Sequence, residues 1–183
     1  LAEMSDGGLF VLFTSHAALR QVAELLRGHA SCERWPLFVQ GEDDRHRLLQ
    51  RFVEHGRGIL LGTTSFWEGV DVPGDPLRGL VIQKLPFRVP TEPITAARME
   101  AVERAGGDAF QQYMLPHAAL RLKQGFGRLI RSRSDRGAVL LLDDRIVAKR
   151  YGRYLRDSLP DAPFIKGAWS DVRRRLQAFY EGG

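Results

Sequence analysis

Residues 9–15 have the sequence Leu9-Phe10-Val11-Leu12-Phe13-Thr14-Ser15, which places five apolar residues directly before two hydroxyl residues. An unbroken apolar run of this length, opened by Gly8, is typical of a strand buried on both faces of a parallel sheet. Thr14 and Ser15 carry the side-chain oxygens that cap helix N-termini, and apolar residues at helical spacing follow through about Arg27. The stretch therefore predicts a buried strand that leads directly into a helix.

The same alternation of a short apolar run and an amphipathic stretch recurs along the chain. Helices are expected after a cap at Asp43 or Asp44, after the proline-rich stretch 86–93, and from Pro116 into Arg131. Strands separated by helices imply right-handed βαβ crossovers, so the predicted fold class is α/β, with a mostly parallel sheet flanked by helices. The carboxyl ends of such strands form the functional edge. The further strands are expected at 37–39, 58–61, 79–85 and 137–142.

Composition sets broad limits on the class of protein. The chain has 183 residues with 44% hydrophobic content, which suits one compact domain. Its net charge is +5, and lysine occurs only at positions 84, 123, 149 and 166, so arginine dominates the basic residues. Arginine is the better fork for phosphate, which fits a polyanionic partner. A GC-rich genome gives the same bias whatever the function, so the charge leaves both explanations open.

The cysteine and histidine content excludes several kinds of site. Cys32 is the only cysteine, so the chain cannot form an internal disulfide, a four-thiolate zinc site or an iron–sulfur cluster. The histidines have no metal-ligand spacing, so no metal site is predicted. A single thiol favours a reducing compartment, and the cytoplasm of a bacterium is the expected location.

The ends and the apolar runs of the chain indicate a fragment of a protein without membrane spans. The apolar runs are all far shorter than the ~18 residues that a membrane-spanning helix needs. No signal-peptide pattern is present at the N-terminus. The chain begins with Leu1, so we expect that it starts inside a longer polypeptide.

The most specific motif is Gln124-Gly125-Phe126-Gly127-Arg128-Leu129-Ile130-Arg131, with the pattern Gln-x-x-Gly-Arg-x-x-Arg at the end of an expected helix. Arg128 and Arg131 are three residues apart and project from nearly the same helix face. Gly127 leaves room for close packing or an approaching partner. Two guanidinium groups and the Gln124 amide can neutralise charge on a transferring phosphoryl group, as arginine fingers do. A solvated basic helix end is the alternative, but the full pattern is more specific than Arg-x-x-Arg.

A second motif, Gly62-Thr63-Thr64-Ser65-Phe66-Trp67-Glu68-Gly69-Val70-Asp71, follows the third expected strand at the functional edge. Hydroxyls and backbone N–H groups in such a loop can bind the phosphates of a nucleic-acid strand. Trp67 can stack on a base or simply pack. Glu68 and Asp71 are the carboxylates near enough to line a nucleotide cleft from this loop. An ordinary polar loop is the alternative, and the threonines alone would favour it.

In this order, three segments resemble helicase motifs IV, V and VI of the DinG/XPD-type branch of superfamily 2. Phe13-Thr14-Ser15 resembles motif IV, residues 66–71 resemble motif V, and residues 124–131 resemble motif VI. Lys84-Leu85-Pro86-Phe87 and Leu142-Asp143-Asp144-Arg145 add family-like sequence between and after them. The resemblance extends from about residue 7 to residue 160.

The resemblance implies that the chain is the second, RecA-like motor domain of an ATP-dependent DNA helicase. That domain would be a three-layer unit over 1–183, with a helical segment at about 92–115 and a helical tail at 145–183. ATP and Mg²⁺ would be bound mainly by an N-terminal P-loop lobe of the same polypeptide. Any iron–sulfur cluster would lie outside this chain, and single-stranded DNA would be the substrate.

The resemblance also implies a role for individual residues. The catalytic positions, which face the γ-phosphate of ATP on the other lobe, would be Arg128, Arg131 and Gln124. The positions on the nucleotide side of the cleft between the lobes would be Gly69, Asp71 and Glu68. The contacts to the translocated single strand would be Thr14, Ser15, Thr63, Thr64 and Trp67.

Two further features support a lobe that is incomplete by itself. The sequence contains no Gly-Lys pair, so it has no P-loop to hold the β- and γ-phosphates. The run 139–144 ends in two acids and resembles a Walker B strand, but it follows the arginine motif and has no P-loop partner. We therefore interpret Asp143, Asp144 and Arg145 as structural or interlobe ion pairs.

Three functions remain open from sequence. The first is a motor lobe that couples ATP hydrolysis to translocation and unwinding in the full-length protein and is inactive as an isolated fragment. The second is a stand-alone nucleic-acid-binding module with a helicase-like fold and no ATPase, whose affinity would fall steeply with salt. The third is an unrelated nucleotide enzyme, which fold class alone cannot support.

Overall fold

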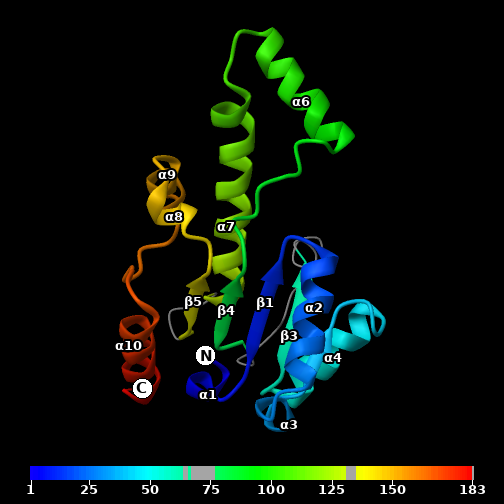
Figure 1. The fold of residues 1–183 in the computed structure, drawn as a ribbon, viewed down its shortest axis with the longest axis vertical. Helices are drawn as coiled ribbons and strands as arrows, with labels where there is room; N and C mark the ends of the chain where they lie inside the picture. The colour runs from blue at the N-terminus through cyan, green and yellow to red at the C-terminus, as the bar shows by residue number, and fades with distance from the viewer. Residues whose placement is uncertain (64–65, 67–76, 131–134, 183) are drawn as a thin grey trace.

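The computed structural model describes residues 1–63, 66, 77–130 and 135–182. Within these residues, five parallel strands form one sheet in the order β2-β3-β1-β4-β5 (Figure 1). The α/β class and the parallel sheet are therefore confirmed, and all carboxyl ends of the strands lie at one edge. The strands are β1 (Leu9–Phe13), β2 (Leu37–Val39), β3 (Ile59–Thr63), β4 (Gly79–Ile82) and β5 (Ala138–Leu141).

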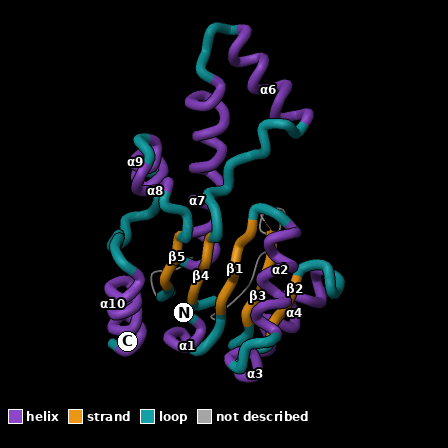
Figure 2. Tube along the Cα trace, viewed as in Figure 1, coloured by secondary structure: helices purple, strands orange, loops and turns teal. Residues whose placement is uncertain are grey.

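Helices cover both faces of the sheet and form its outer layers (Figure 2). None of the helices in the described ranges is long and apolar enough to cross a membrane. They are α1 (Ala2–Ser5), α2 (His16–Arg27), α3 (Ser31–Arg34), α4 (Arg45–His55), α6 (Pro93–Arg104), the π-helix η1 (Phe110–Met114), α7 (Leu115–Leu129), α8 (Arg145–Ala148), α9 (Tyr151–Asp157) and α10 (Trp169–Glu181).

Alternation along β1 divides its side chains between two cores. Phe10 and Leu12 are buried in a large cluster with residues of α4, α7, α8 and α9. Leu9 and Phe13 point to the other face and pack in a second cluster, in which Leu19 of α2 is fully buried. Because successive strand side chains point to opposite faces, this central strand holds the three layers together.

The helix caps follow the sequence prediction. Ser15 caps α2, because its side chain accepts a hydrogen bond from the backbone N–H of Ala18 at 3.3 Å. Asp44 caps α4 by accepting from the N–H groups of His46 and Arg47. Each cap satisfies N–H groups that have no partner inside the helix. As a result, α2 begins directly after β1, at the functional edge of the sheet.

Several element boundaries differ from the prediction. Strand β4 ends at Ile82 rather than residue 85, because the N–H of Leu85 donates to the side chain of Asp143 instead of to a neighbouring strand. Helix α7 ends at Leu129, since Ile130 has extended backbone angles (φ −116°, ψ 105°). At its other end, α7 continues the π-helix η1 without a break, so the helical rod starts at Phe110, before the expected Pro116.

The rod formed by η1 and α7 rises with α6 beyond the carboxyl edge of the sheet, as the green segment at the top of Figure 1. An aromatic cluster anchors the base of this projection. The ring of Phe87 stacks on Phe110 with centroids 5.7 Å apart, and Tyr151 of α9 meets both rings at 5.6 Å and 5.2 Å. Aromatic pairs at these separations attract beyond their burial. The cluster therefore fixes the loop that follows β4 against α7 and α9.

Two leucines on α7 test whether burial against the sheet stabilises the fold. Leu122 is 1% exposed, whereas Leu120 is 53% exposed on the same helix. We expect Leu122→Ala to lower the free energy of unfolding by roughly 2–5 kcal/mol, because it removes buried methyl groups and leaves a cavity. Leu120→Ala should change it by less than about 1 kcal/mol. Urea unfolding followed by circular dichroism measures both values, and equal losses would contradict the packing described.

Candidate functional site

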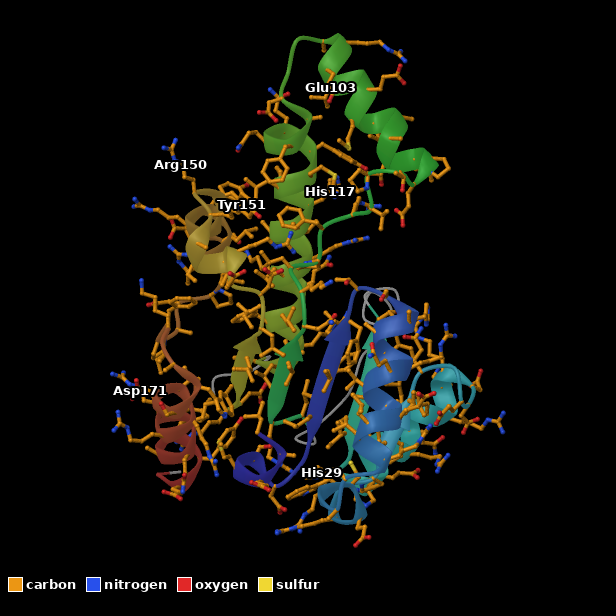
Figure 3. The ribbon with its side chains drawn as sticks, in the orientation of Figure 1. His29, Glu103, His117, Arg150, Tyr151 and Asp171 are labelled. Carbon is orange, nitrogen blue, oxygen red and sulfur yellow. The ribbon has the colours of Figure 1, made fainter. Side chains whose placement is uncertain are left out.

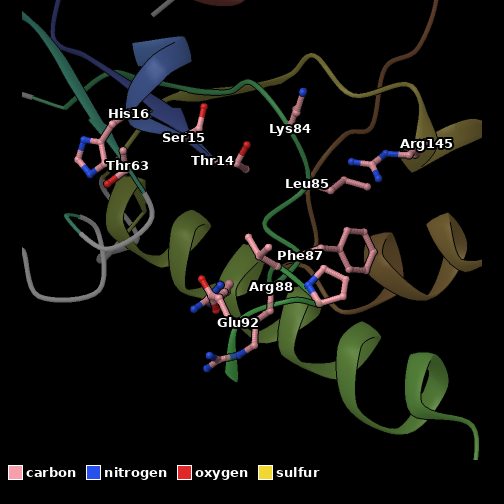
Figure 4. Close-up of a pocket in the computed structure, with 13 residues that line it drawn as sticks. Thr14, Ser15, His16, Thr63, Lys84, Leu85, Phe87, Arg88, Glu92 and Arg145 are labelled. Atoms are coloured by element: carbon pink, nitrogen blue, oxygen red, sulfur yellow. The ribbon is translucent and has the colours of Figure 1, made fainter. Parts of the chain in front are cut away.

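A cleft of about 440 Å³ opens at the carboxyl edge of the sheet (Figure 4). Parallel pairing of Phe13 with Thr63 brings the end of β1 beside the end of β3. Thr14, Ser15 and Thr63, all predicted to contact a nucleic-acid strand, therefore line the same cleft. Thr14 and Ser15 are exposed, while Thr63 is buried.

Thr63 is held in place by hydrogen bonds to Gln40, a residue outside the predicted motifs. The side-chain Oε1 of Gln40, which follows β2, accepts hydrogen bonds from the backbone N–H of Thr63 at 2.7 Å and from its hydroxyl at 3.0 Å. Because Thr63 is 5% exposed, its hydroxyl orders the edge of the sheet rather than reaching into solvent. The accessible hydroxyls of this wall are therefore those of Thr14 and Ser15.

Cationic side chains from distant parts of the chain line the same cleft. Lys84 and Arg88 come from the loop after β4, Arg121 from α7, and Arg145 from the start of α8. Lys84 and Arg145 belong to the family-like segments of the sequence, whereas none of the predicted motifs contains Arg88 or Arg121. Glu92 is the carboxylate on this lining. Since the cations outnumber the carboxylates on its lining, the cleft favours an anionic ligand.

Asp143 is the buried support of the loop that carries these cations. Its carboxylate accepts from the N–H of Leu85 at 2.9 Å and pairs with the Arg145 guanidinium at 2.6 Å. The Arg145 hydrogen bond lowers the pKa of Asp143 below its usual range, against the opposing effect of burial, with help from the backbone N–H groups. The ion pair predicted for these residues is thus present, and it ties the end of β5 to the segment after β4.

Two of the predicted catalytic residues, Gln124 and Arg128, lie on α7 and outside the cleft lining. Gln124 and Arg128 are three and seven positions beyond Arg121, so the three share one face of the helix. Arg128 lies about 10 Å farther along the axis than Arg121. Gln124 is exposed and Arg128 is half-buried. The space next to the Gly127 Cα is open: a side chain there would have no atom of another described segment within 4 Å of its Cβ. The surface at Gly127 is therefore accessible to an approaching partner.

Six of the predicted site residues lie outside the described residues, and their roles stay predictions: Thr64, Trp67, Glu68, Gly69, Asp71 and Arg131.

No metal centre is formed by the described residues, since they contain no group of three or more histidine, cysteine or carboxylate side chains placed to hold an ion. The one cysteine, Cys32, has its pKa raised by burial, which leaves it a protonated thiol at neutral pH. The described part of the chain thus offers cations and hydroxyls for phosphate but no ligand set for a metal.

The chain matches the helicase C-terminal domain family over residues 1–162. The chain is 46% identical over 173 residues to the ATP-dependent DNA helicase YoaA of Escherichia coli, which covers 94% of this chain and 27% of that protein. It is 47% identical over 154 residues to the ATP-dependent DNA helicase DinG of Photobacterium profundum, covering 82% and 22%. The chain therefore spans about a quarter of the length of these relatives.

Solved structures show the same architecture. Apo XPD superposes with a TM-score of 0.65 at 18% identity, covering 91% of this chain and 34% of that one. At this identity the similarity establishes the fold, and the RecA-like architecture expected from the sequence is confirmed.

Acid unfolding tests the role of Asp143. Because its pKa is lowered in the folded state, its stabilisation is complete above the ordinary carboxyl pKa of about 4 and is lost as pH falls through the lowered value. We expect Asp143→Asn to cost about 1–3 kcal/mol at pH 7. The gap to the wild type should shrink as pH falls below about 4.

Urea unfolding at a series of pH values from 7 to 2.5 measures this gap. The exposed Asp161→Asn variant is the matched control and should follow the wild type throughout. A gap for Asp143→Asn that stays constant across this range would show that the carboxylate is not the group responsible.

Proposed function

The chain belongs to the helicase C-terminal domain family, in its DinG/XPD-type branch, and from this premise we propose that it is the second motor lobe of an ATP-driven DNA helicase. It would work with a P-loop lobe of the same polypeptide and couple ATP hydrolysis to movement along single-stranded DNA and to duplex unwinding. The names of the relatives support ATP and DNA as the reactants of the full-length protein.

The observation that carries this proposal is the placement of two different surfaces on one helix. Arg121 of α7 lines the cleft that also contains Thr14 and Ser15. Gln124 and Arg128 lie farther along the same face of α7, about 7 residues or 10 Å away at most. A rigid helix that carries both surfaces would transmit a displacement at one of them directly to the other.

At the Gln124 and Arg128 surface, we propose contact with ATP bound to the other lobe. Hydrolysis moves negative charge onto the oxygens of the γ-phosphoryl group and the leaving group, and positioned guanidinium groups stabilise that charge. Arg128, with Arg131, would supply these groups, while the Gln124 amide would orient the γ-phosphate or the attacking water. The open surface at Gly127 would let the other lobe approach closely.

Mg²⁺ would arrive with the nucleotide and be held mainly by the P-loop lobe, because the described residues here supply no metal-binding cluster. Its chemistry there is to neutralise charge on the β- and γ-phosphates. With one cysteine in the chain, any iron–sulfur cluster of the full-length protein would be held elsewhere.

At the cleft, we propose contact with the sugar–phosphate backbone of single-stranded DNA. The exposed hydroxyls of Thr14 and Ser15 can donate to phosphate oxygens, as small polar side chains commonly do. Thr64 and Trp67 are the other predicted contacts, while the buried Thr63 would order the strand end through its hydrogen bonds to Gln40. ATP binding would close the lobes and hydrolysis would release them, so that alternating grip on the strand would produce movement.

Removal of the arginines tests the ATP surface in the full-length protein. We expect Arg128→Ala and Arg131→Ala each to lower DNA-stimulated ATP turnover by roughly 10³-fold or more, the range known for arginine fingers. Arg174→Ala on α10, whose exposed side chain pairs with Asp171, is the matched control and should keep normal turnover. Turnover that is indifferent to both arginines, in variants that remain folded, would refute the motor mechanism.

Activity of the isolated lobe provides an independent check. The 183-residue chain by itself should show no ATP turnover above background, with or without single-stranded DNA, because no P-loop is present to hold the phosphates. A phosphate-release assay on the purified chain measures this. Turnover that copurifies with the folded chain would contradict the division of labour between two lobes.

A further inference from the structure

The loop after β4 presents two cations from a fixed backbone. Leu85 is tied to Asp143 by the 2.9 Å hydrogen bond, and Phe87 is stacked on Phe110. The Arg145 guanidinium also lies over the Phe87 ring, with its Cζ 5.6 Å from the ring centroid. Lys84 and Arg88 flank these two anchored residues. Their backbone positions are therefore set before any ligand arrives, which limits the entropy lost on binding.

Neither cation is paired with a carboxylate of the described residues. Within the described ranges, Lys84 and Arg88 form no ion pair, and the Nε of Arg88 is buried without an acceptor. Arg145, in contrast, lines the same cleft with its charge matched by Asp143. A buried guanidinium donor without an acceptor is unfavourable, so a nearby anion would gain more here than at a solvated arginine.

The electrostatic environment around Arg88 is positive on the α7 side as well. His117 has its pKa lowered, first by burial and then by the charges of Arg88 and Arg121. Glu92 is the opposing carboxylate on the cleft lining, and its Oε2 already accepts from the Thr95 hydroxyl at 3.4 Å. Arg88 and Arg121 are therefore close enough to His117 for their charges to act on it from both the loop and α7.

The opposite wall of the cleft carries complementary groups. Thr14 and Ser15 present exposed hydroxyls from the end of β1, and Figure 4 shows them across the cleft from the segment that bears Arg88. Lys84 lies beside these hydroxyls, because the ends of β1 and β4 are neighbours. Hydroxyl and cationic donors on both sides of the cleft match a phosphodiester, whose oxygens accept hydrogen bonds from both sides.

We propose that Lys84, beside Thr14 and Ser15, and Arg88, across the cleft from them, each bind a backbone phosphate of the single strand. The proposal rests on the function proposed above and adds to it the residues that supply the salt-dependent part of the affinity. Lysine and arginine contacts release counterions from the strand, whereas hydroxyl contacts do not. The two loop residues therefore govern how steeply binding falls with salt.

The test is the salt dependence of binding between the full-length protein and a fluorescein-labelled oligo-dT. The logarithm of the association constant is plotted against the logarithm of KCl concentration. We expect the double variant Lys84→Gln, Arg88→Gln to lower the steepness of this line by about 1.4, since each single-strand phosphate contact contributes about 0.7. The charge-retaining variant Lys84→Arg, Arg88→Lys should keep most of the wild-type slope.

A matched double variant controls for the overall loss of two positive charges. Arg174→Gln with Arg175→Gln removes two exposed cations from α10, which lies at the other end of the sheet from the cleft (Figure 1). Its slope should equal that of the wild type. If the first double variant is unstable by thermal unfolding, Lys84→Gln alone decides, because its exposed side chain supports no core contact, and it should lower the slope by about 0.7.

The outcomes separate this inference from the function on which it rests. A wild-type protein that fails to bind oligo-dT would remove the proposed function itself. Normal wild-type binding with an unchanged slope in the Lys84 and Arg88 variants would overturn the inference and leave the motor function standing. An unchanged slope with a raised KM for ATP would assign the cleft to the nucleotide and overturn it as well.

Discussion

The arrangement of the site depends on one buried carboxylate. Asp143 follows the edge strand β5, and it binds both the N–H of Leu85, after β4, and the guanidinium of Arg145. A buried carboxylate is stable in the charged form only when donors surround it, and these donors come from two separate segments. The same interaction ends β4 early and turns the chain into the cleft. Arg145 then lies over the Phe87 ring, and Phe87 stacks on Phe110 at the base of the helical projection. These contacts connect Asp143 to the projection.

Helix α7 connects this edge to the rest of the lobe. Its buried side, which includes Leu115, Leu122 and Leu129, packs in the large core over its whole length. The helix therefore cannot shift at one end without disturbing the other, because packed cores have discrete arrangements rather than a continuum. Arg121 at the cleft and Arg128 farther along are half-buried on the flank of this buried side. Such a rod is suited to coupling two binding events.

Local sequence was sufficient where local chemistry decides the structure. Apolar runs and capping residues predicted β1, β2 and the starts of α2 and α4, because Ser15 and Asp44 act on N–H groups within three residues. The parallel order of strands followed from their alternation with helices. The cleft lining was predicted only in part: Thr14, Ser15 and Thr63 stand at strand ends, whereas Arg88 and Arg121 reach the lining from other segments of the chain. Gln40 supports Thr63 through a contact between residues that are distant in sequence. No local pattern encodes those contacts. Arg121 could have been predicted from the sequence, because it precedes Arg128 by seven residues and therefore lies on the same face of the helix.

The positions of the arginines in the fold help to choose between the two explanations of the net charge, a polyanionic partner and a GC-rich genome. Most of the exposed arginines in the described regions meet acids on the surface, as Arg47 and Arg51 meet Asp43, and Arg153 meets Asp157. Exposed pairs of this kind contribute little and would arise from any arginine-rich composition. The excess charge therefore says less about a phosphate partner than its location does. Cations that remain without an acid at the functional edge, on a backbone held by Asp143, are the part of the composition that a nucleic-acid strand would recognise.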